Sequence, residues 1–173
     1  MKRTLVALGI LGFVCGAAQA QEAKPGSDLK KLDFWNGEWT FEVQGKDRKS
    51  GEEWKVKGKG EQVQLGDHFY VWRDKVKNAD GEEFSNMNIG GYDPVKKAHF
   101  VEHFGSDGGR GTGVLTFSDK SMTSDTTALS ATGEETRERC TYSRSEQENT
   151  GTCEILTDGE WWVSSKAKFT KVK

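Results

Sequence analysis

Alternating apolar and polar positions are the dominant pattern along this chain. Near residues 35–43, apolar residues and glycines recur at every second position: Trp35, Gly37, Trp39, Phe41 and Val43. The polar Asn36, Glu38, Thr40 and Glu42 occupy the positions between them. A period of two residues is typical of a β-strand with one buried face. A helix would scatter the aromatic residues around its surface, so we expect a strand here.

The segment 54–61 repeats this alternation in a more polar form. Trp54 and Val56 fall on the inward face, and a row of lysines, Lys55, Lys57 and Lys59, falls on the other. Alternate lysines are typical of a solvated strand face. Gly58 and Gly60 share the inward face, and we expect them to mark a bend or bulge at which the sheet curls.

Short strands follow at the regular spacing of an all-β fold. We predict eight more, at residues 68–76, 84–91, 98–104, 111–117, 120–128, 135–143, 150–156 and 160–170. Turn signals such as Asp80-Gly81, Asp93-Pro94 and Asp158-Gly159 separate them. With no long helical segment between strands, the pattern predicts a single antiparallel β-barrel of about ten strands. A short helical turn through Leu29, Leu32 and Phe34 precedes it.

Two cysteines fit this topology. If 135–143 and 150–156 form a hairpin that turns near Glu146 and Gln147, the antiparallel register places Cys140 opposite Cys153. The same register places Tyr142 opposite Gly151 and Glu138 opposite Ile155. Facing residues of a hairpin are close enough for a disulfide, so we predict a Cys140–Cys153 bridge.

The N-terminal segment has the features of an export signal. Lys2 and Arg3 form a positive start, an apolar stretch follows, and Ala18-Gln19-Ala20 is a small-residue cleavage site. We therefore predict a signal peptide at 1–20, a flexible leader at 21–30 and a barrel domain at 31–173, with a periplasmic or secreted location. The alternative is a lipoprotein acylated at Cys15, but Val14 is a poor fit to the small residue needed there.

Charge and composition narrow the partners. The chain has 25 Lys and Arg against 27 Asp and Glu, with no long block of one sign, which disfavours nucleic-acid binding. After signal cleavage no integral membrane segment is expected. Only 34% of residues are hydrophobic, yet six tryptophans and nine phenylalanines are present, so a few large aromatic side chains must carry the core.

Two motifs resemble known barrels. Residues 32–39, Leu-Asp-Phe-Trp-Asn-Gly-Glu-Trp, resemble the first strand of lipocalin-like barrels, in which a glycine and a tryptophan two residues later close the base. Residues 89–97, Ile-Gly-Gly-Tyr-Asp-Pro-Val-Lys-Lys, resemble a bacterial family of unknown function with a lipocalin-like fold. The resemblance implies a barrel with an interior cavity and no established activity. The ten strands and the lack of a long C-terminal helix depart from lipocalins.

A barrel of this size can hold one small ligand. Alternation gives the residues expected to bind it: Trp39, Phe41, Trp54, Tyr70, Trp72, Phe100, Glu102, Phe104 and Trp161. Val56, Val163 and Phe169 belong to the same inward set. The sequence predicts no cofactor and no metal site.

Strand 98–104 offers two facings. If Phe100 and Phe104 point inward, Glu102 is a carboxylate in an aromatic space, suited to a polar ligand group or to acid-base work. If the other face points inward, His99 and His103 enter the cavity and are able to ligate a metal or haem. His68 is a further catalytic candidate. Arg137 and Arg139 are expected to face water.

The function predicted from these observations is binding of a small apolar or amphipathic molecule. The alternatives are a small isomerase, cyclase or hydrolase that uses Glu102 with a histidine, and a haem-binding barrel. No nucleophile elbow or phosphate-binding loop is present in the sequence. The oligomeric state is open.

Overall fold

A computed structural model describes residues 29–172, which form one short 3-10 helix and ten strands. The predicted signal peptide, 1–20, and leader residues 21–28 lie outside the described residues. The helix η1 is Leu29–Trp35. The strands are β1 Gly37–Lys46, β2 Glu53–Leu65, β3 Phe69–Asn78, β4 Glu83–Asp93, β5 Ala98–Gly105, β6 Arg110–Phe117, β7 Ser121–Leu129, β8 Glu135–Ser143, β9 Glu148–Thr157 and β10 Glu160–Lys171.

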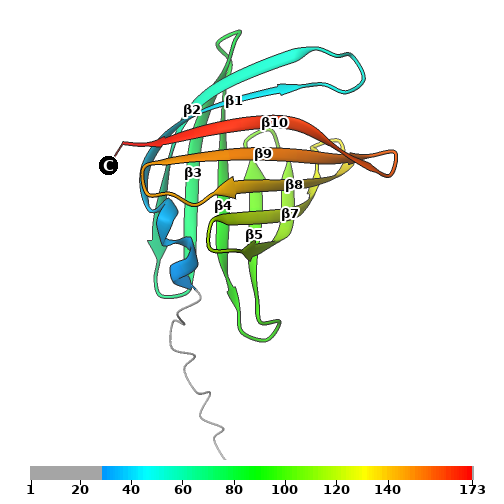
Figure 1. Ribbon diagram of the computed structural model, residues 1–173. Coiled ribbons are helices and arrows are strands. Elements are labelled where there is room, and N and C mark those ends of the chain that lie inside the picture. Colours follow the sequence, from blue (N-terminus) through cyan, green and yellow to red (C-terminus); the bar gives the residue numbers. More distant parts are fainter. Residues whose placement is uncertain (1–28, 173) are drawn as a thin grey trace, which may run out of the picture.

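The strands form one closed barrel (Figure 1). Each strand pairs antiparallel with the next along the chain, and β1 pairs with β10 to close the ring. Short turns connect the strands, as the Gly and Asp-Gly signals predict. The ten-stranded antiparallel barrel is therefore confirmed, and each strand begins and ends within a few residues of the predicted limits.

The helix η1 closes one end of the barrel. Leu29, Leu32 and Trp35 are buried, and they pack against Trp39 and Tyr70 at the start of β1 and β3. The indole N–H of Trp39 donates to the Trp35 carbonyl at 2.8 Å, and the Trp39 side chain is 0% exposed. The burial of Trp39 at the base is confirmed. Trp35, predicted in the first strand, instead belongs to the helix, and the strand begins at Gly37.

The glycines of β2 serve close packing rather than a bulge. Gly58 and Gly60 keep regular register with β1 and β3. A Cβ atom at Gly58 would lie 2.4 Å from the Phe41 ring, and one at Gly60 would lie 2.5 Å from the Trp72 ring. Of the predicted bend or bulge, the bulge is thus wrong: the absent side chains leave room for two aromatic rings on the neighbouring strands to lie across the backbone.

The irregularity of the sheet lies in β10 instead. Its pairing with β9 shifts register between Val163 and Ser165, and both Ser164 and Ser165 are buried. An extra residue in one strand reverses which positions point inward on its far side. Phe169 therefore faces the cavity, while Val163 is exposed on the other face.

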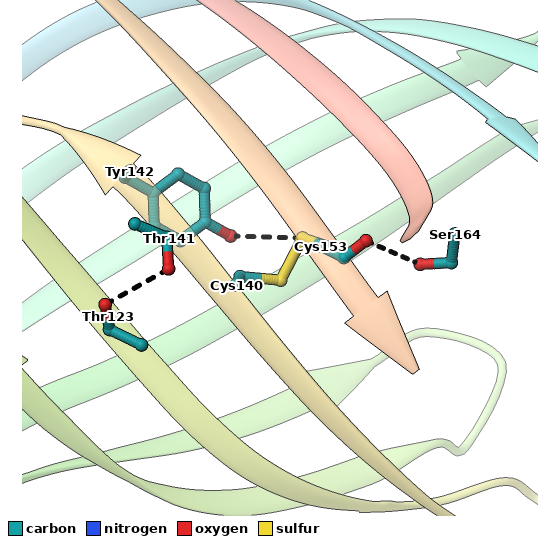
Figure 2. Close-up of a disulfide and its surroundings, with 6 residues drawn as sticks. All are labelled: Thr123, Cys140, Thr141, Tyr142, Cys153 and Ser164. Carbon is teal, nitrogen blue, oxygen red and sulfur yellow. Dashed lines mark hydrogen bonds between the residues drawn. A yellow bond between two sulfur atoms is a disulfide. The ribbon is translucent and has the colours of Figure 1, made fainter. Parts of the chain in front are cut away.

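The cysteine hairpin has the predicted register. Cys140 pairs with Cys153, Tyr142 with Gly151, and Glu138 with Ile155. A disulfide joins the two cysteines across β8 and β9, with a Cα–Cα distance of 4.0 Å (Figure 2). The Tyr142 hydroxyl lies 3.9 Å from Cys153 Sγ.

Candidate functional site

The barrel encloses a cavity of about 630 Å³ between the helix η1 and the opposite end. Leu32 and Trp35 form its floor. A volume of this size accommodates one small organic molecule. The cavity has two unlike sides, which we name the aromatic wall and the polar wall.

The aromatic wall consists of Phe41, Trp54, Trp72 and Phe169, on β1, β2, β3 and β10. Phe41 and Phe169 lie 5.5 Å apart between ring centroids, and Trp35 contacts Trp72 at 5.7 Å and Phe169 at 4.9 Å. Edge-to-face and tilted contacts between aromatic rings contribute stability in addition to the stability gained from burying their surface. Trp54 is 42% exposed, as expected for a ring that lines a cavity open at that point.

The polar wall consists of Ser124, Thr126, Glu138 and Cys140, on β7 and β8. These strands lie side by side in the barrel, with Thr126 opposite Glu138 and Ser124 opposite Cys140. Because Ser124, Thr126 and Cys140 are short, this wall takes up little of the barrel interior, and it offers hydrogen-bonding groups.

A second set of polar side chains lines the cavity from β3, β4 and β5: Asp74, Asn86, Asn88 and His103. The Asp74 carboxylate accepts hydrogen bonds from Trp72 Nε1 at 2.7 Å and Asn86 Nδ2 at 2.9 Å. His103 Nδ1 lies 2.8 Å from Asn88 Oδ1, so the neutral ring donates there and keeps its Nε2 lone pair free to accept. Burial raises the pKa of Asp74, against the effect of its two donors, and burial lowers the pKa of His103. Both shifts favour the uncharged forms.

The side chain of Glu138 differs from that of Asp74 because no described residue hydrogen-bonds to its carboxyl or pairs with its charge. Burial alone raises the pKa of its carboxyl. A carboxyl oxygen of Glu138 and both cysteine sulfurs lie within 4.8 Å of one another. Those sulfurs are joined in the disulfide, so they are not free thiolates able to ligate a metal.

Several predicted ligand-binding residues do line the cavity. These are Phe41, Trp54, Tyr70 and Trp72, together with Val56 and Phe169. Tyr70 is anchored by a hydrogen bond to Asp33, and burial followed by the Asp33 contact raises its pKa to about 12. Trp39 lies below the cavity, behind Trp35, and supports the floor.

On β5 the structure takes the histidine facing. Val101 and His103 line the cavity, which places Phe100, Glu102 and Phe104 on the outer surface, contrary to their predicted ligand-binding position. Glu102 accepts a hydrogen bond from the Thr112 hydroxyl of β6 at 2.9 Å. Phe100 contacts Phe69 on the same outer face. The assumption that the larger apolar set points inward fails because the outer face around β5 also carries apolar side chains, among them Phe69, Phe104 and Val114.

The remaining candidates lie away from the cavity wall. His99 is buried between Tyr92 and Phe117 near the base. His68 lies between β2 and β3, beside Phe69. The predicted inward position of Trp161 is also wrong: it follows from unbroken alternation along β10, and the bulge reverses it. Trp161 instead lies under the outward Arg139 guanidinium at 4.4 Å.

Sequence reasoning missed these polar residues of the cavity: Gln62, Asp74, Asn86, Asn88, Ser124, Thr126 and Glu138. The sequence does contain a signal for Glu138, because the predicted hairpin register places it opposite the apolar Ile155 and two positions from Cys140. A carboxylate two positions from a cysteine whose side chain points inward must share its face.

The described part of the chain contains no helix that is long and apolar enough to cross a membrane.

The fold and site define a closed ten-stranded barrel with an internal cavity of ligand size. The chain belongs to the family described as "Protein of unknown function (DUF1579)", which matches residues 24–171. No curated protein matches the sequence.

Of the solved structures that follow, the first shares the fold of this chain. Rv2717c from M. tuberculosis superposes with a TM-score of 0.66 at 13% identity, covering 86% of this chain and 99% of its own. A de novo designed fluorescence-activating β-barrel has a TM-score of 0.43 at 15% identity, covering 82% of this chain and 97% of its own. The structure of EF1p2_mFAP2b bound to DFHBI has a TM-score of 0.44 at 8% identity, covering 82% of this chain and 97% of its own.

Proposed function

We propose that the protein binds one small apolar or amphipathic molecule inside the barrel. The observation that carries this proposal is the cavity of about 630 Å³, lined by an aromatic wall and faced by a few polar groups. This combination of apolar surface and sparse, placed polar groups is typical of small-molecule sites. Side chains fill the base around Trp39 but leave the middle of the barrel empty.

Native mass spectrometry and visible absorption of the purified protein test whether a ligand copurifies. The same absorption spectrum tests the haem alternative, for which His103 is the one predicted histidine that lines the cavity. The enzyme alternative loses its named carboxylate, because Glu102 lies on the outer face.

A matched pair of variants locates binding. Ala128 lines the cavity and its neighbour Thr127 points outward, so Ala128→Phe fills the cavity and Thr127→Phe does not. With Nile red as a neutral probe, we expect Ala128→Phe to weaken binding at least fivefold and Thr127→Phe to leave it unchanged. Equal affinities for the two variants would place the probe outside the barrel and contradict the proposal.

We further propose that the protein acts after export, in the periplasm or outside the cell. The signal-like sequence 1–20 and the Cys140–Cys153 bridge support this, since disulfides persist in oxidising compartments. N-terminal sequencing of the mature protein should begin after Ala20. An intact N-terminus in the cytoplasmic fraction would refute export.

A further inference from the structure

The charges inside the cavity are of one sign. Asp74 and Glu138 line it, whereas none of the described lining residues is a lysine or an arginine. A site that binds a carboxylate or phosphate normally contains a lysine or arginine side chain that pairs with the anion. This cavity therefore disfavours anions such as fatty acids and favours a ligand that brings hydrogen-bond donors or positive charge.

Glu138 is the group left for such a ligand. Both oxygens of Asp74 already accept hydrogen bonds, and His103, whose Nδ1 is bonded to Asn88, offers a neutral Nε2 acceptor but no negative charge. Glu138 has no partner among the described residues. Glu138 is half-buried. A partly desolvated carboxylate without a partner is costly, and a ligand cation would offset that cost.

The nearest arginines in sequence are held away from the cavity. Arg137 and Arg139 flank Glu138 on β8 but point to the outer surface, where both bind Asp125, at 3.3 and 2.9 Å. Both also lie over the ring of Trp161, at 5.9 and 4.4 Å. Because each guanidinium has a carboxylate and an aromatic partner outside, neither neutralises Glu138 from within.

The opposite side of the barrel completes the site. In the ring of ten strands, β3 lies five strands from β8 in either direction, so Trp72 on the aromatic wall faces the strand that carries Glu138. Aromatic faces suit an apolar body and attract a nearby cation. We propose that the ligand is a cationic amphipathic molecule, whose basic nitrogen pairs with Glu138 while its apolar body packs on Phe41, Trp54 and Trp72. This inference rests on the proposed function.

Three matched probes test the charge preference by fluorescence titration near neutral pH. Dansylcadaverine ends in a primary amine, its N-acetyl derivative is neutral, and N-dansyl-6-aminohexanoic acid ends in a carboxylate. We expect the amine to bind at least tenfold more tightly than the carboxylate, with the neutral probe between them. Equal affinities for the three probes would overturn the charge inference and leave small-molecule binding intact, whereas no binding of any probe would overturn both.

Variants assign the preference to a residue. Glu138→Gln keeps the shape of the side chain and removes its charge, so it should weaken amine binding about tenfold and leave the neutral probe unaffected. Glu102→Gln removes a carboxylate from the outer face and should leave the affinity for all three probes unchanged. Asp74→Asn should have a smaller effect than Glu138→Gln, because Asp74 already has two donors. Unchanged amine affinity in Glu138→Gln, with the fold confirmed by circular dichroism, would overturn the assignment.

Discussion

The two walls of the cavity are built on opposite principles. The aromatic wall gains its stability from packing: Trp72 and Phe169 contact Trp35 of the floor edge to face, Phe41 packs on Phe169 at a tilt, and Gly58 and Gly60 make room for the rings. The polar wall has small side chains and little packing of its own. It is held by the Cys140–Cys153 disulfide inside and by the ion pairs of Asp125 outside. The first wall supports the fold, and the second leaves the space and the chemistry.

This division explains where ligand selectivity should reside. Aromatic rings accept many apolar bodies, since area burial is not directional. The hydrogen bonds and charge interactions that Glu138 and its neighbours on β7 and β8 can make are directional. The Glu138 carboxyl lacks a side-chain partner and its pKa is raised by burial, so it should distinguish ligands by their charge. Stability and selectivity are therefore expected to respond to changes in different walls.

The largest effect is expected below the aromatic wall. Trp39→Ala removes a fully buried indole and its hydrogen bond to Trp35, and should lower the free energy of unfolding by about 3–5 kcal/mol. Glu38→Ala, on the exposed face of the same strand, should cost less than about 0.5 kcal/mol. Denaturant melts of both variants measure the difference, and equal shifts would show that packing at the base does not carry the fold.

The polar wall should depend on its covalent bridge. Replacing Cys140 and Cys153 together by alanine opens a loop closed over a separation of 13 residues, and should destabilise by about 3 kcal/mol. The intact protein should weigh two hydrogen masses less than its reduced form. Two freely alkylatable thiols in native material, or melts that are insensitive to reductant, would show that this wall is held in another way.

The same contrast separates what the sequence could predict from what it could not. Strict alternation between large aromatic and charged residues placed Phe41, Trp54 and Trp72 correctly, because the contrast in β1 to β3 is strong. In β5 both faces carry apolar or aromatic residues, so the pattern left the facing of Glu102 and His103 open. In β7 the inward Ser124 and Thr126 resemble their outward neighbours Thr123 and Asp125, and only the partner strand reveals the face. The β10 bulge has no local sequence signal and misplaced Trp161.

The Glu138 carboxylate should destabilise the folded protein once the pH rises above the acidic range. Burial raises its pKa from the ordinary 4.5, so the folded chain holds its proton over a range where the unfolded chain has lost it. The free energy of unfolding should therefore fall as pH rises through that range and stay lower at neutral pH. Glu138→Gln should raise stability at neutral pH, on the order of 1 kcal/mol, and flatten the pH dependence. Urea melts from pH 4 to 8 test this, and a variant less stable than the parent at neutral pH would mean that the carboxylate has a stabilising partner.

The smallest effect is expected from substitution of Glu102, whose carboxylate lies on the outer face of β5. Glu102 is hydrogen-bonded to Thr112 across β5 and β6, at a surface where water also serves as a partner. Glu102→Gln keeps an acceptor for the threonine hydroxyl and should change the free energy of unfolding by less than about 0.5 kcal/mol. Urea melts at neutral pH measure both variants. A stability change in Glu102→Gln as large as in Glu138→Gln would show that the two carboxylates contribute alike, and the distinction between the cavity wall and an ordinary outer surface would then fail.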